Sequence, residues 1–330
     1  MSPNDSVAPT VSVVIASHNY GHFLAESVES VLSQTWRDLE LIVVDDGSTD
    51  ATRQVIGGFA HDTRLRYVWQ ERRGQAAAFN RGLAMARGRY LALHAADDVW
   101  LPHKLARQVE VLESRPEVGL VYTNTTVVDA RGEFQHFHFR GGRVAPAVGW
   151  VLPTLVQRNF VPAPSVLLRR EVLDVVGRHD ESLEVCEDWD LWLRVAKEVQ
   201  FGYIDEPLVR IRRHGGNTHL RQAPSLRDPF RVLDRFPKVV VPWEALGRGV
   251  KGWAYANVCT EAAGVLYDAG AHAAALAQLG RAALLQPRAI SWHELRLAVK
   301  CALGLVGLRP GLVGTAARRV PTFTQWVARG

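Results

Sequence analysis

The sequence predicts an α/β protein in which a mostly parallel sheet flanked by helices is followed by a small all-α region. Between residues 11 and 94, short β-branched apolar runs alternate with stretches of helical period, a pattern typical of parallel strands joined by helical crossovers. From about residue 222 onward strand signals vanish, and a helical periodicity rich in Ala, Leu and Gly takes over. We therefore expect one domain over residues 1–220 and a helical domain over 221–330.

Four apolar runs predict the first strands of the sheet. The run 11–16 is short and rich in Val and Ile, as a strand buried on both faces should be. The second run ends sharply at Asp45-Asp46-Gly47, where Ser48 or Thr49 is placed to cap a helix that reaches Phe59. The expected strands are 11–16, 39–44, 65–69 and 89–93, and the expected helices between and after them are 24–32 and 76–86.

The pattern changes after Asp98. A helix is expected over 104–112, followed by a long strand over 118–128 and a short one at 166–168. The stretch 188–199 has the spacing of a strongly amphipathic helix. Two short strands separated by Pro207 are expected over residues 201–213, because proline cannot donate to a sheet.

The C-terminal third shows two further features. Small residues at packing positions over 253–287 resemble one tetratricopeptide-like helical hairpin, which needs a neighbour to cover its apolar face. The stretch 295–327 mixes Leu, Val and Gly with basic residues. It predicts either ordinary helices docked on the protein or basic amphipathic helices that lie on a membrane surface.

Composition limits the compartment and the partners. The three cysteines are odd in number and far apart, so no disulfide framework is expected and a reducing cytoplasm is the simplest location. The N-terminus is polar, without the apolar core of a signal peptide, and no window is apolar enough for a transmembrane helix. The net charge of +5 is spread along the chain, which argues against a nucleic-acid partner and agrees with an anionic substrate or peripheral contact with the inner face of a membrane.

Two acidic pairs carry the first indication of chemistry. Asp45-Asp46 follows the second expected strand and Asp97-Asp98 follows the fourth. Ligands of open α/β sheets bind beyond the carboxyl ends of the strands, and adjacent carboxylates there need a cationic or hydrogen-bonding partner. A divalent ion that carries a diphosphate is such a partner, since Mg²⁺ and Mn²⁺ prefer carboxylate and phosphate oxygens. Either pair alone could instead cap a helix and face solvent.

Four ordered segments resemble the family-2 glycosyltransferases with the GT-A (Rossmann-like) fold, of the type that builds bacterial cell-surface glycans. The segments, which span roughly residues 10–215, are VSVVIASHNYGHFLAESVESVLSQTW, LELIVVDDGSTD, GQAAAFNRGLAMARGRYLALHAADDVWLPHKL and CEDWDLWLR. The resemblance implies an enzyme that takes a sugar from a nucleotide-diphosphate donor, a UDP-sugar in the first instance. It also implies a divalent metal, Mn²⁺ or Mg²⁺, and a glycan or lipid-linked acceptor.

The resemblance also implies roles for individual residues. Asp188, with Glu187 beside it, matches the position of the general base of a single inverting displacement. Asp97 and Asp98 match the motif that holds ribose and metal, and Asp45 is expected closer to the base than Asp46. The loop around His214 is expected to close over the donor, although a solvated basic turn is an alternative. The residues implied in donor binding are Ser17, Asn19, Tyr20, Asp45, Asp46, Asn80, Arg81, Asp97, Asp98 and His214.

One departure leaves rival functions open. Many relatives carry Asp or Asn where this chain has Ala95, so metal binding would depend on Asp97 and Asp98 alone. A non-catalytic nucleotide-sugar-binding or scaffold protein is therefore the first alternative. A nucleotidyltransferase is the second, but the expected Gly- and Lys/Arg-rich loop after the first strand is missing. Trp100 and Trp189 are candidates for a sugar-stacking platform or for the core, whereas the spacing of Trp192 favours the core.

Overall fold

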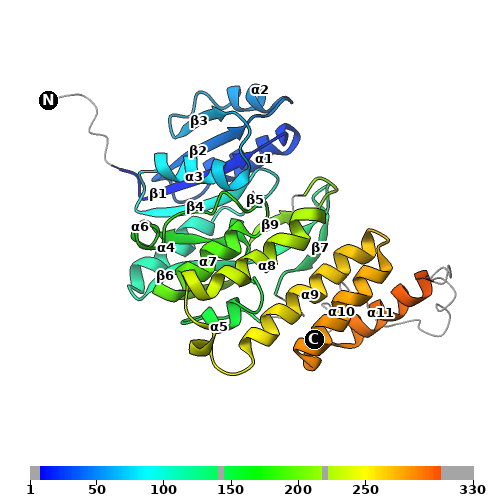
Figure 1. The fold of residues 1–330 in the computed structure, drawn as a ribbon. Helices are drawn as coiled ribbons and strands as arrows, with labels where there is room; N and C mark the ends of the chain where they lie inside the picture. Colours follow the sequence, from blue (N-terminus) through cyan, green and yellow to red (C-terminus); the bar gives the residue numbers. More distant parts are fainter. Residues whose placement is uncertain (1–7, 140–144, 218–221, 306–330) are drawn as a thin grey trace. The chain divides into compact units, whose positions relative to one another are not determined.

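The computed structural model describes residues 8–139, 145–217 and 222–305. The chain divides into two compact units (Figure 1), and each is described by itself. Unit 1 comprises Met1–Val151 and Val161–His214, and unit 2 comprises Leu152–Phe160 and Gly215–Gly330. The boundary expected at residue 220 lies in the stretch 218–221, outside the described residues.

Unit 1 is built on a nine-stranded sheet in the order β3-β2-β1-β4-β8-β6-β9-β5, with β7 paired to β6. The first four strands in this order run parallel to one another, as the alternating strand and helix signals predict. Beyond them β8 is antiparallel to both β4 and β6, while β6 and β9 are parallel. The strands are β1 (Val11–Ser17), β2 (Leu39–Asp46), β3 (Leu65–Gln70), β4 (Tyr90–Ala95), β5 (Val99–Trp100), β6 (Val118–Val128), β7 (Phe134–Phe137), β8 (Leu167–Arg169) and β9 (Gln200–Arg212).

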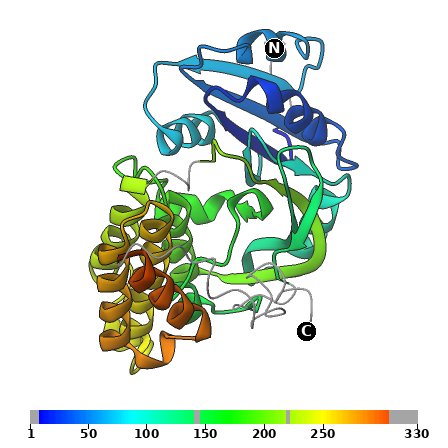
Figure 2. The ribbon, with the colours of Figure 1, turned by 90° about the vertical axis from the view of Figure 1, so that its right-hand side faces the viewer.

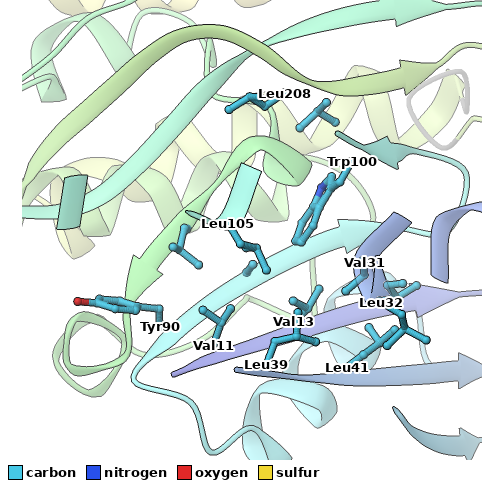
Figure 3. Packing of buried hydrophobic residues seen from close by; sticks show 14 of the residues in the cluster. Val11, Val13, Val31, Leu32, Leu39, Leu41, Tyr90, Trp100, Leu105 and Leu208 are labelled. Carbon is cyan, nitrogen blue, oxygen red and sulfur yellow. The ribbon is translucent and has the colours of Figure 1, made fainter. Parts of the chain in front are cut away.

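Helices cover both faces of the parallel part of the sheet. The side chains of β1 alternate between the two faces, and each set packs in an apolar layer. Val11, Val13 and Ile15 pack in one cluster with α1 and α4, part of which Figure 3 shows. Val14 points the other way and lies against Gly82 of α3, where a Cβ atom would come within 2.2 Å of Val14 Cγ1. The helices of unit 1 are α1 (Gly21–Leu32), α2 (Thr52–Gly57), α3 (Gln75–Met85), α4 (Lys104–Ser114), α6 (Arg170–Val176) and α7 (Glu187–Glu198).

Two local expectations differ from the structure. Residues 200–212 form one strand, β9, and Pro207 sits opposite Asn124 at an irregularity of the register, so the ladder passes the proline without needing its missing N–H. Helix α2 begins at Thr52 and is not capped by Ser48 or Thr49; the Asp50 carboxylate accepts the Thr52 N–H at 3.0 Å instead. The elements β7 and α6 had no predicted counterpart.

Unit 2 is helical throughout its described residues, apart from short turns. Its helices are α5 (Leu152–Leu155), α8 (Gln222–Val239), α9 (Val250–Asp268), α10 (His272–Leu285) and α11 (Trp292–Leu305). Consecutive helices from α8 to α11 contact each other and lie side by side in Figure 2, where they are coloured from yellow-green to orange. Small residues allow this close packing, with Ala263, Ala275 and Cys301 fully buried around Leu279. Within the described residues, no helix combines the length and the apolar character needed to cross a membrane.

Candidate active site

The ends of β1, β2 and β4 meet at one edge of the sheet. In the parallel register Ser17 lies beside Asp45 of β2, and its neighbour Ala16 lies beside Ala95 of β4. The chain leaves β4 at Ala95 and continues directly into Asp97-Asp98. The structure therefore brings the two acidic pairs and the end of β1 to the same carboxyl edge, where open α/β sheets bind ligands.

Asp45 is buried at the end of β2 and has one described donor on each oxygen. Its Oδ1 accepts the Ser48 N–H at 2.8 Å, and its Oδ2 accepts the Tyr67 hydroxyl at 2.7 Å. Burial and the hydrogen bond to Asp45 raise the pKa of Tyr67, so this phenol remains a donor at neutral pH. The two hydrogen bonds thus fix the orientation of the Asp45 carboxyl at the sheet edge.

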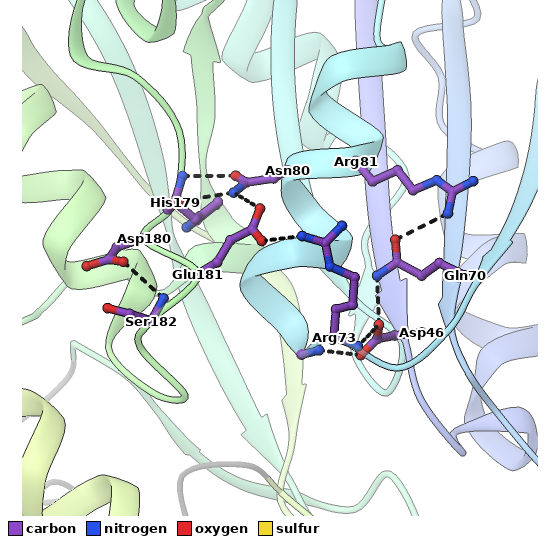
Figure 4. A network of polar contacts seen from close by, with 10 residues as sticks. Asp46, Gln70, Arg73, Asn80, Arg81, His179, Asp180, Glu181 and Ser182 are labelled. Carbon is purple, nitrogen blue, oxygen red and sulfur yellow. Dashed lines mark hydrogen bonds and ion pairs between the residues drawn. The ribbon is translucent and has the colours of Figure 1, made fainter.

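Asp46 organises the loop that follows β3 (Figure 4). Its Oδ1 accepts Gln70 Nε2 at 2.7 Å and the backbone N–H of Arg73 at 2.8 Å, and its Oδ2 accepts the Gly74 N–H at 2.8 Å. Arg81 reaches the same group indirectly, since its Nη1 lies 3.5 Å from Gln70 Oε1. Asp46 and Arg81 therefore belong to one polar network at the start of α3.

The loop after β1 is hydrogen-bonded to the loop after β2. Asn19 adopts the left-handed conformation with φ of 60°. Its Oδ1 accepts the Thr49 N–H at 2.8 Å, and its own N–H donates to Ser48 Oγ at 2.9 Å. Asparagine tolerates this conformation better than most residues, and such backbone outliers cluster at functional loops. Ser17 Oγ is buried and has no hydrogen-bond partner among the residues that the structure describes.

Asp97 and Asp98 are both buried and are bound from β9 and the loop after it. His214 Nε2 lies 2.9 Å from Asp97 Oδ2, and Asp98 Oδ1 accepts the Arg212 N–H at 2.8 Å. Burial and the adjacent charge of Asp97 raise the pKa of the Asp98 carboxyl well above its ordinary value, and Arg212 offsets only part of this. Tyr20 lies against His214, with ring centroids 5.6 Å apart.

The end of β9 and His214 are held against the acidic pair, whereas Arg213, Gly215 and Gly216 are exposed. The Arg212 guanidinium is 5% exposed and is fully engaged by the protein: Nε donates to the Asp97 carbonyl at 3.0 Å and Nη2 pairs with Glu26 at 2.6 Å. His214 is likewise mostly buried against Asp97. Arg212 therefore anchors the segment that brings His214 to the acidic pair.

The acidic pair fits a divalent cation that also binds the donor. Within the described ranges, no three His, Cys, Asp or Glu side chains cluster so that the protein alone could hold a metal ion. Mg²⁺ and Mn²⁺ sites of this kind use one or two carboxylates, with substrate phosphates and water completing the shell. Two adjacent buried carboxylates, whose burial and mutual repulsion a bound cation would offset, make such a donor set.

Helix α7 begins with the predicted catalytic pair. Cys186, just before it, is one of two non-glycine residues with positive φ in the described part of the chain, and the other is Asn19. The left-handed conformation is unfavourable for a cysteine residue, so the turn into α7 stores local strain. Glu187 is buried, whereas Asp188 is half-buried and its Oδ1 accepts its neighbour's N–H, that of Trp189, at 2.6 Å.

The segment before α7 is bound to α3 by Asn80, which the family resemblance singled out, and by partners that it did not. Asn80 of α3 donates to the His179 carbonyl and accepts the His179 N–H, both at 3.0 Å. Its amide also donates to Glu181 Oε1 at 3.0 Å, and Glu181 Oε2 pairs with Arg73 at 2.9 Å. These contacts join residues about a hundred positions apart, so no local pattern in the sequence could have indicated His179, Glu181 or Arg73.

None of the candidate tryptophans forms an exposed platform. Trp100, Trp189 and Trp192 are 2%, 4% and 0% exposed, so all three belong to the core. The indole of Trp100 donates to the Pro164 carbonyl at 2.9 Å and lies under the buried Lys104 ammonium. The stacking role suggested for Trp100 and Trp189 is therefore wrong, since burial leaves no ring face for a sugar.

Comparisons with known proteins show which proteins the chain is similar to. The profile of "Glycosyl transferase family 2" matches residues 12–173, which includes both acidic pairs. An uncharacterized glycosyltransferase of Nostoc sp. is 33% identical over 64% of this chain and 67% of its own length. The putative glycosyltransferase EpsE of Bacillus subtilis is 32% identical over 62% of this chain and 73% of its own length.

Solved structures show a similar fold. S. aureus TarS residues 1–349, crystallised with UDP, is similar at a TM-score of 0.54 with 17% identity, over 89% of this chain and 92% of that one. Mannosyltransferase PcManGT of Pyrobaculum calidifontis, crystallised with GDP-Man and Mn²⁺, is similar at 0.54 with 19% identity, over 99% and 87%. This chain spans 53% of a longer TarS chain. At these identities the likeness concerns the fold alone.

Proposed function

We propose a specific reaction for this chain, which belongs to glycosyl transferase family 2 and is a glycosyltransferase of the GT-A fold. It transfers a sugar from a nucleotide-diphosphate donor, in the first instance a UDP-sugar, to a glycan or lipid-linked acceptor with inversion at the anomeric carbon. The supporting observation is the shared carboxyl edge, where the register sets Ser17 beside Asp45 and Ala16 beside Ala95, directly before Asp97-Asp98. TarS and PcManGT, which share the fold, were crystallised with nucleotide-sugar ligands.

In the proposed donor site, Asp45 receives a hydrogen bond from the base, and Ser17 offers its otherwise unpartnered hydroxyl beside it. Asn19, Tyr20 and the loop that Asp46 fixes border the nucleoside. Asn80 and Arg81 lie on α3, which follows that loop. Arg81 remains a candidate for positioning the nucleotide, whereas the Asn80 side chain is bound to the segment before α7. The whole set lies within unit 1.

Asp97, Asp98 and His214 are proposed to bind the diphosphate end of the donor. Asp97 and Asp98 would hold Mn²⁺ or Mg²⁺, which when bound neutralises charge on the departing diphosphate. His214 keeps Asp97 oriented through its 2.9 Å contact. Arg212 holds the main chain of this segment against Asp98, so the binding groups are set before the donor arrives.

Asp188 is the proposed general base and Glu187 its neighbour in the site. The acceptor hydroxyl oxygen forms a bond to the anomeric carbon while the bond from that carbon to the diphosphate oxygen breaks. The Asp188 carboxylate takes the hydroxyl proton, and the nucleoside diphosphate leaves with the bonding electrons. An α-linked donor then gives a β-linked product. Asp188 suits this role because, unlike Glu187, it is only half-buried, so part of the residue is exposed to solvent.

Peripheral contact with a membrane is proposed through one face of α11. Trp292, Leu295 and Val299 are 82%, 47% and 54% exposed and share one side of the helix, and the exposed cations Arg296 and Lys300 flank them. An apolar stripe beside basic residues suits an anionic lipid surface. Residues 306–327 of the stretch predicted to lie on a membrane fall outside the described residues.

A nucleotide-release assay tests the proposed reaction. We expect release from at least one of UDP-glucose, UDP-N-acetylglucosamine, UDP-galactose and GDP-mannose, with Mn²⁺ increasing the rate. Asp98→Asn should abolish the metal dependence. No release above the enzyme-free rate from any of the four donors, with or without Mn²⁺, would refute the assigned donor class. A product with retained configuration would refute the single displacement.

A further inference from the structure

We propose that Asn80 is a positioning residue for the general base. It fixes the segment 177–186, and through it the first turn of α7 with Glu187 and Asp188, against helix α3. The proposal rests on the role proposed above for Asp188, and it goes beyond it by giving Asn80 a task other than contact with the nucleotide. Asn80, His179, Glu181 and Arg73 are called the Asn80 network below (Figure 4).

The side chain of Asn80 makes three hydrogen bonds to the segment before α7. Both of its donor bonds go there, one to the His179 carbonyl and one to Glu181 Oε1, and its Oδ1 accepts the His179 N–H. An asparagine amide has two N–H donors and one carbonyl oxygen, so both donors and one acceptor position are engaged. An accepting group of the nucleotide, such as a phosphate oxygen, could bind this amide only if one of its two donor bonds broke.

His179 connects Asn80 to α7 through its ring. Its ring is 6% exposed and packs on Phe79 of α3, with centroids 5.6 Å apart. Its Nδ1 lies 3.2 Å from the carbonyl oxygen of Glu187, the first residue of the helix. The ring must therefore donate from Nδ1, because a carbonyl only accepts. A continuous path thus runs from Asn80 through the His179 backbone and ring to the residue beside Asp188.

The segment needs such an external support. Residues between α6 and α7 form only turns and bends, and Cys186 holds an unfavourable left-handed conformation immediately before Glu187. A strained turn persists only when surrounding contacts over-determine it. The two backbone bonds from Asn80 to His179 supply that support from a rigid helix, and a misplacement of about 1 Å at a reacting group can cost a hundredfold in rate.

The ion pair between Arg73 and Glu181 contributes less. Its side chains are 64% and 40% exposed, and pairs this open to water stabilise little. We therefore expect different effects on kcat when Asn80 and when the ion pair are removed, although both contact Glu181. We expect Asn80→Ala to lower kcat about 10- to 100-fold with the KM for the donor changed less than about threefold. Arg73→Ala removes the ion pair alone and should lower kcat less than Asn80→Ala does.

The decisive experiment is a double-mutant cycle with Asp188→Asn, measured by UDP release from UDP-N-acetylglucosamine, or from whichever donor of the panel above is turned over. If Asn80 acts through the base, Asn80→Ala costs nothing further once Asp188→Asn has removed that base. Independent, multiplying losses would overturn the proposal. So would a raised donor KM with unchanged kcat in Asn80→Ala, which would place Asn80 on the nucleotide instead.

Two further measurements keep the outcome interpretable. Asn80→Ser retains a polar group that can serve one backbone bond, and an intermediate kcat supports the proposal if Asn80→Ala does not fold; wild-type kcat in Asn80→Ser overturns it. Hydrogen exchange of the segment 177–186 should be faster in either variant, and unchanged exchange overturns it as well. Failure of the proposed function is seen separately, because Asp188→Asn itself would then keep wild-type turnover.

Discussion

The buried neutral state of His179 makes the stability of unit 1 depend on pH. Burial, reinforced by the charge of Arg194, lowers the pKa of His179 from 6.5 to about 4, although the hydrogen bond to the Glu187 carbonyl works in the opposite direction. The unfolded chain therefore binds a proton at this residue below pH 6.5, while the folded protein takes it up only near pH 4. Stability from His179 is complete above about pH 6.5 and is lost as the pH falls toward 4.

The loss follows from the size of this shift. A difference of about 2.5 pKa units corresponds to about 3 kcal/mol at pH 4 and below, and to about 2 kcal/mol between pH 7 and pH 5. His179 is nearly fully buried, so screening by solvent does not reduce this figure much. His94 is also buried with a lowered pKa and acts in the same direction, but its effect cancels when a His179 variant is compared with the wild type.

His179→Gln isolates the effect. A glutamine amide can still donate toward the Glu187 carbonyl but does not titrate, so the variant should be less stable at pH 7 and lose less stability on acidification. In urea denaturation followed by circular dichroism, the gap between the wild type and the variant should narrow by about 2 kcal/mol from pH 7 to pH 5. The exposed control His61→Gln should follow the wild type. Parallel curves for the wild type and His179→Gln would refute the reasoning.

Three other outcomes are expected. Asp188→Asn should reduce transfer by a factor of about 10² or more while UDP binding, measured by calorimetry, stays within about threefold of the wild type; wild-type turnover would move the base elsewhere. Gly88→Ala should lower the free energy of unfolding by about 1–3 kcal/mol, because its Cβ would lie 2.4 Å from the Ser12 backbone nitrogen, whereas Gly57→Ala meets nothing within 4 Å and should not destabilise. Trp292→Ser with Leu295→Ser should weaken sedimentation with phosphatidylglycerol vesicles more than Leu284→Ser does, and equal losses would argue against an α11 membrane face.

The parallel half of the sheet was predictable because its strands are buried on both faces. β1 and β2 are short segments dominated by Val, Ile and Leu and almost entirely buried, and their ends are marked by polar residues. Family 2 membership and the GT-A fold followed from the same segments and are confirmed. Local signals failed where the context decides, as at Pro207, which β9 accommodates by a shift of register that depends on β6.

The Asn80 network shows a second limit. Asn80 drew attention because it lies in a family motif, and the motif indicates only that the side chain matters. Its partners, His179 and Glu181, are 99 and 101 residues away and lie in a segment without helical or strand periodicity. The contact depends on how α3 and the turn before α7 meet in the folded unit. No spacing rule within either segment contains that information.

Asp45 and Asp46 have different hydrogen-bond partners, and the residue type alone does not predict this difference. Successive side chains at the end of a strand point to opposite faces, so Asp45 meets Tyr67 of β3 while Asp46 turns to the loop after β3. Each carboxylate can accept about four hydrogen bonds. Asp46 receives three from Gln70, Arg73 and Gly74, all of which shape the protein, whereas Asp45 accepts the Ser48 N–H and the Tyr67 hydroxyl. Asp45 therefore keeps more capacity for a donor from a ligand and lies beside the unpartnered hydroxyl of Ser17, which is why we place the nucleotide base on Asp45 and assign to Asp46 the loop that borders it.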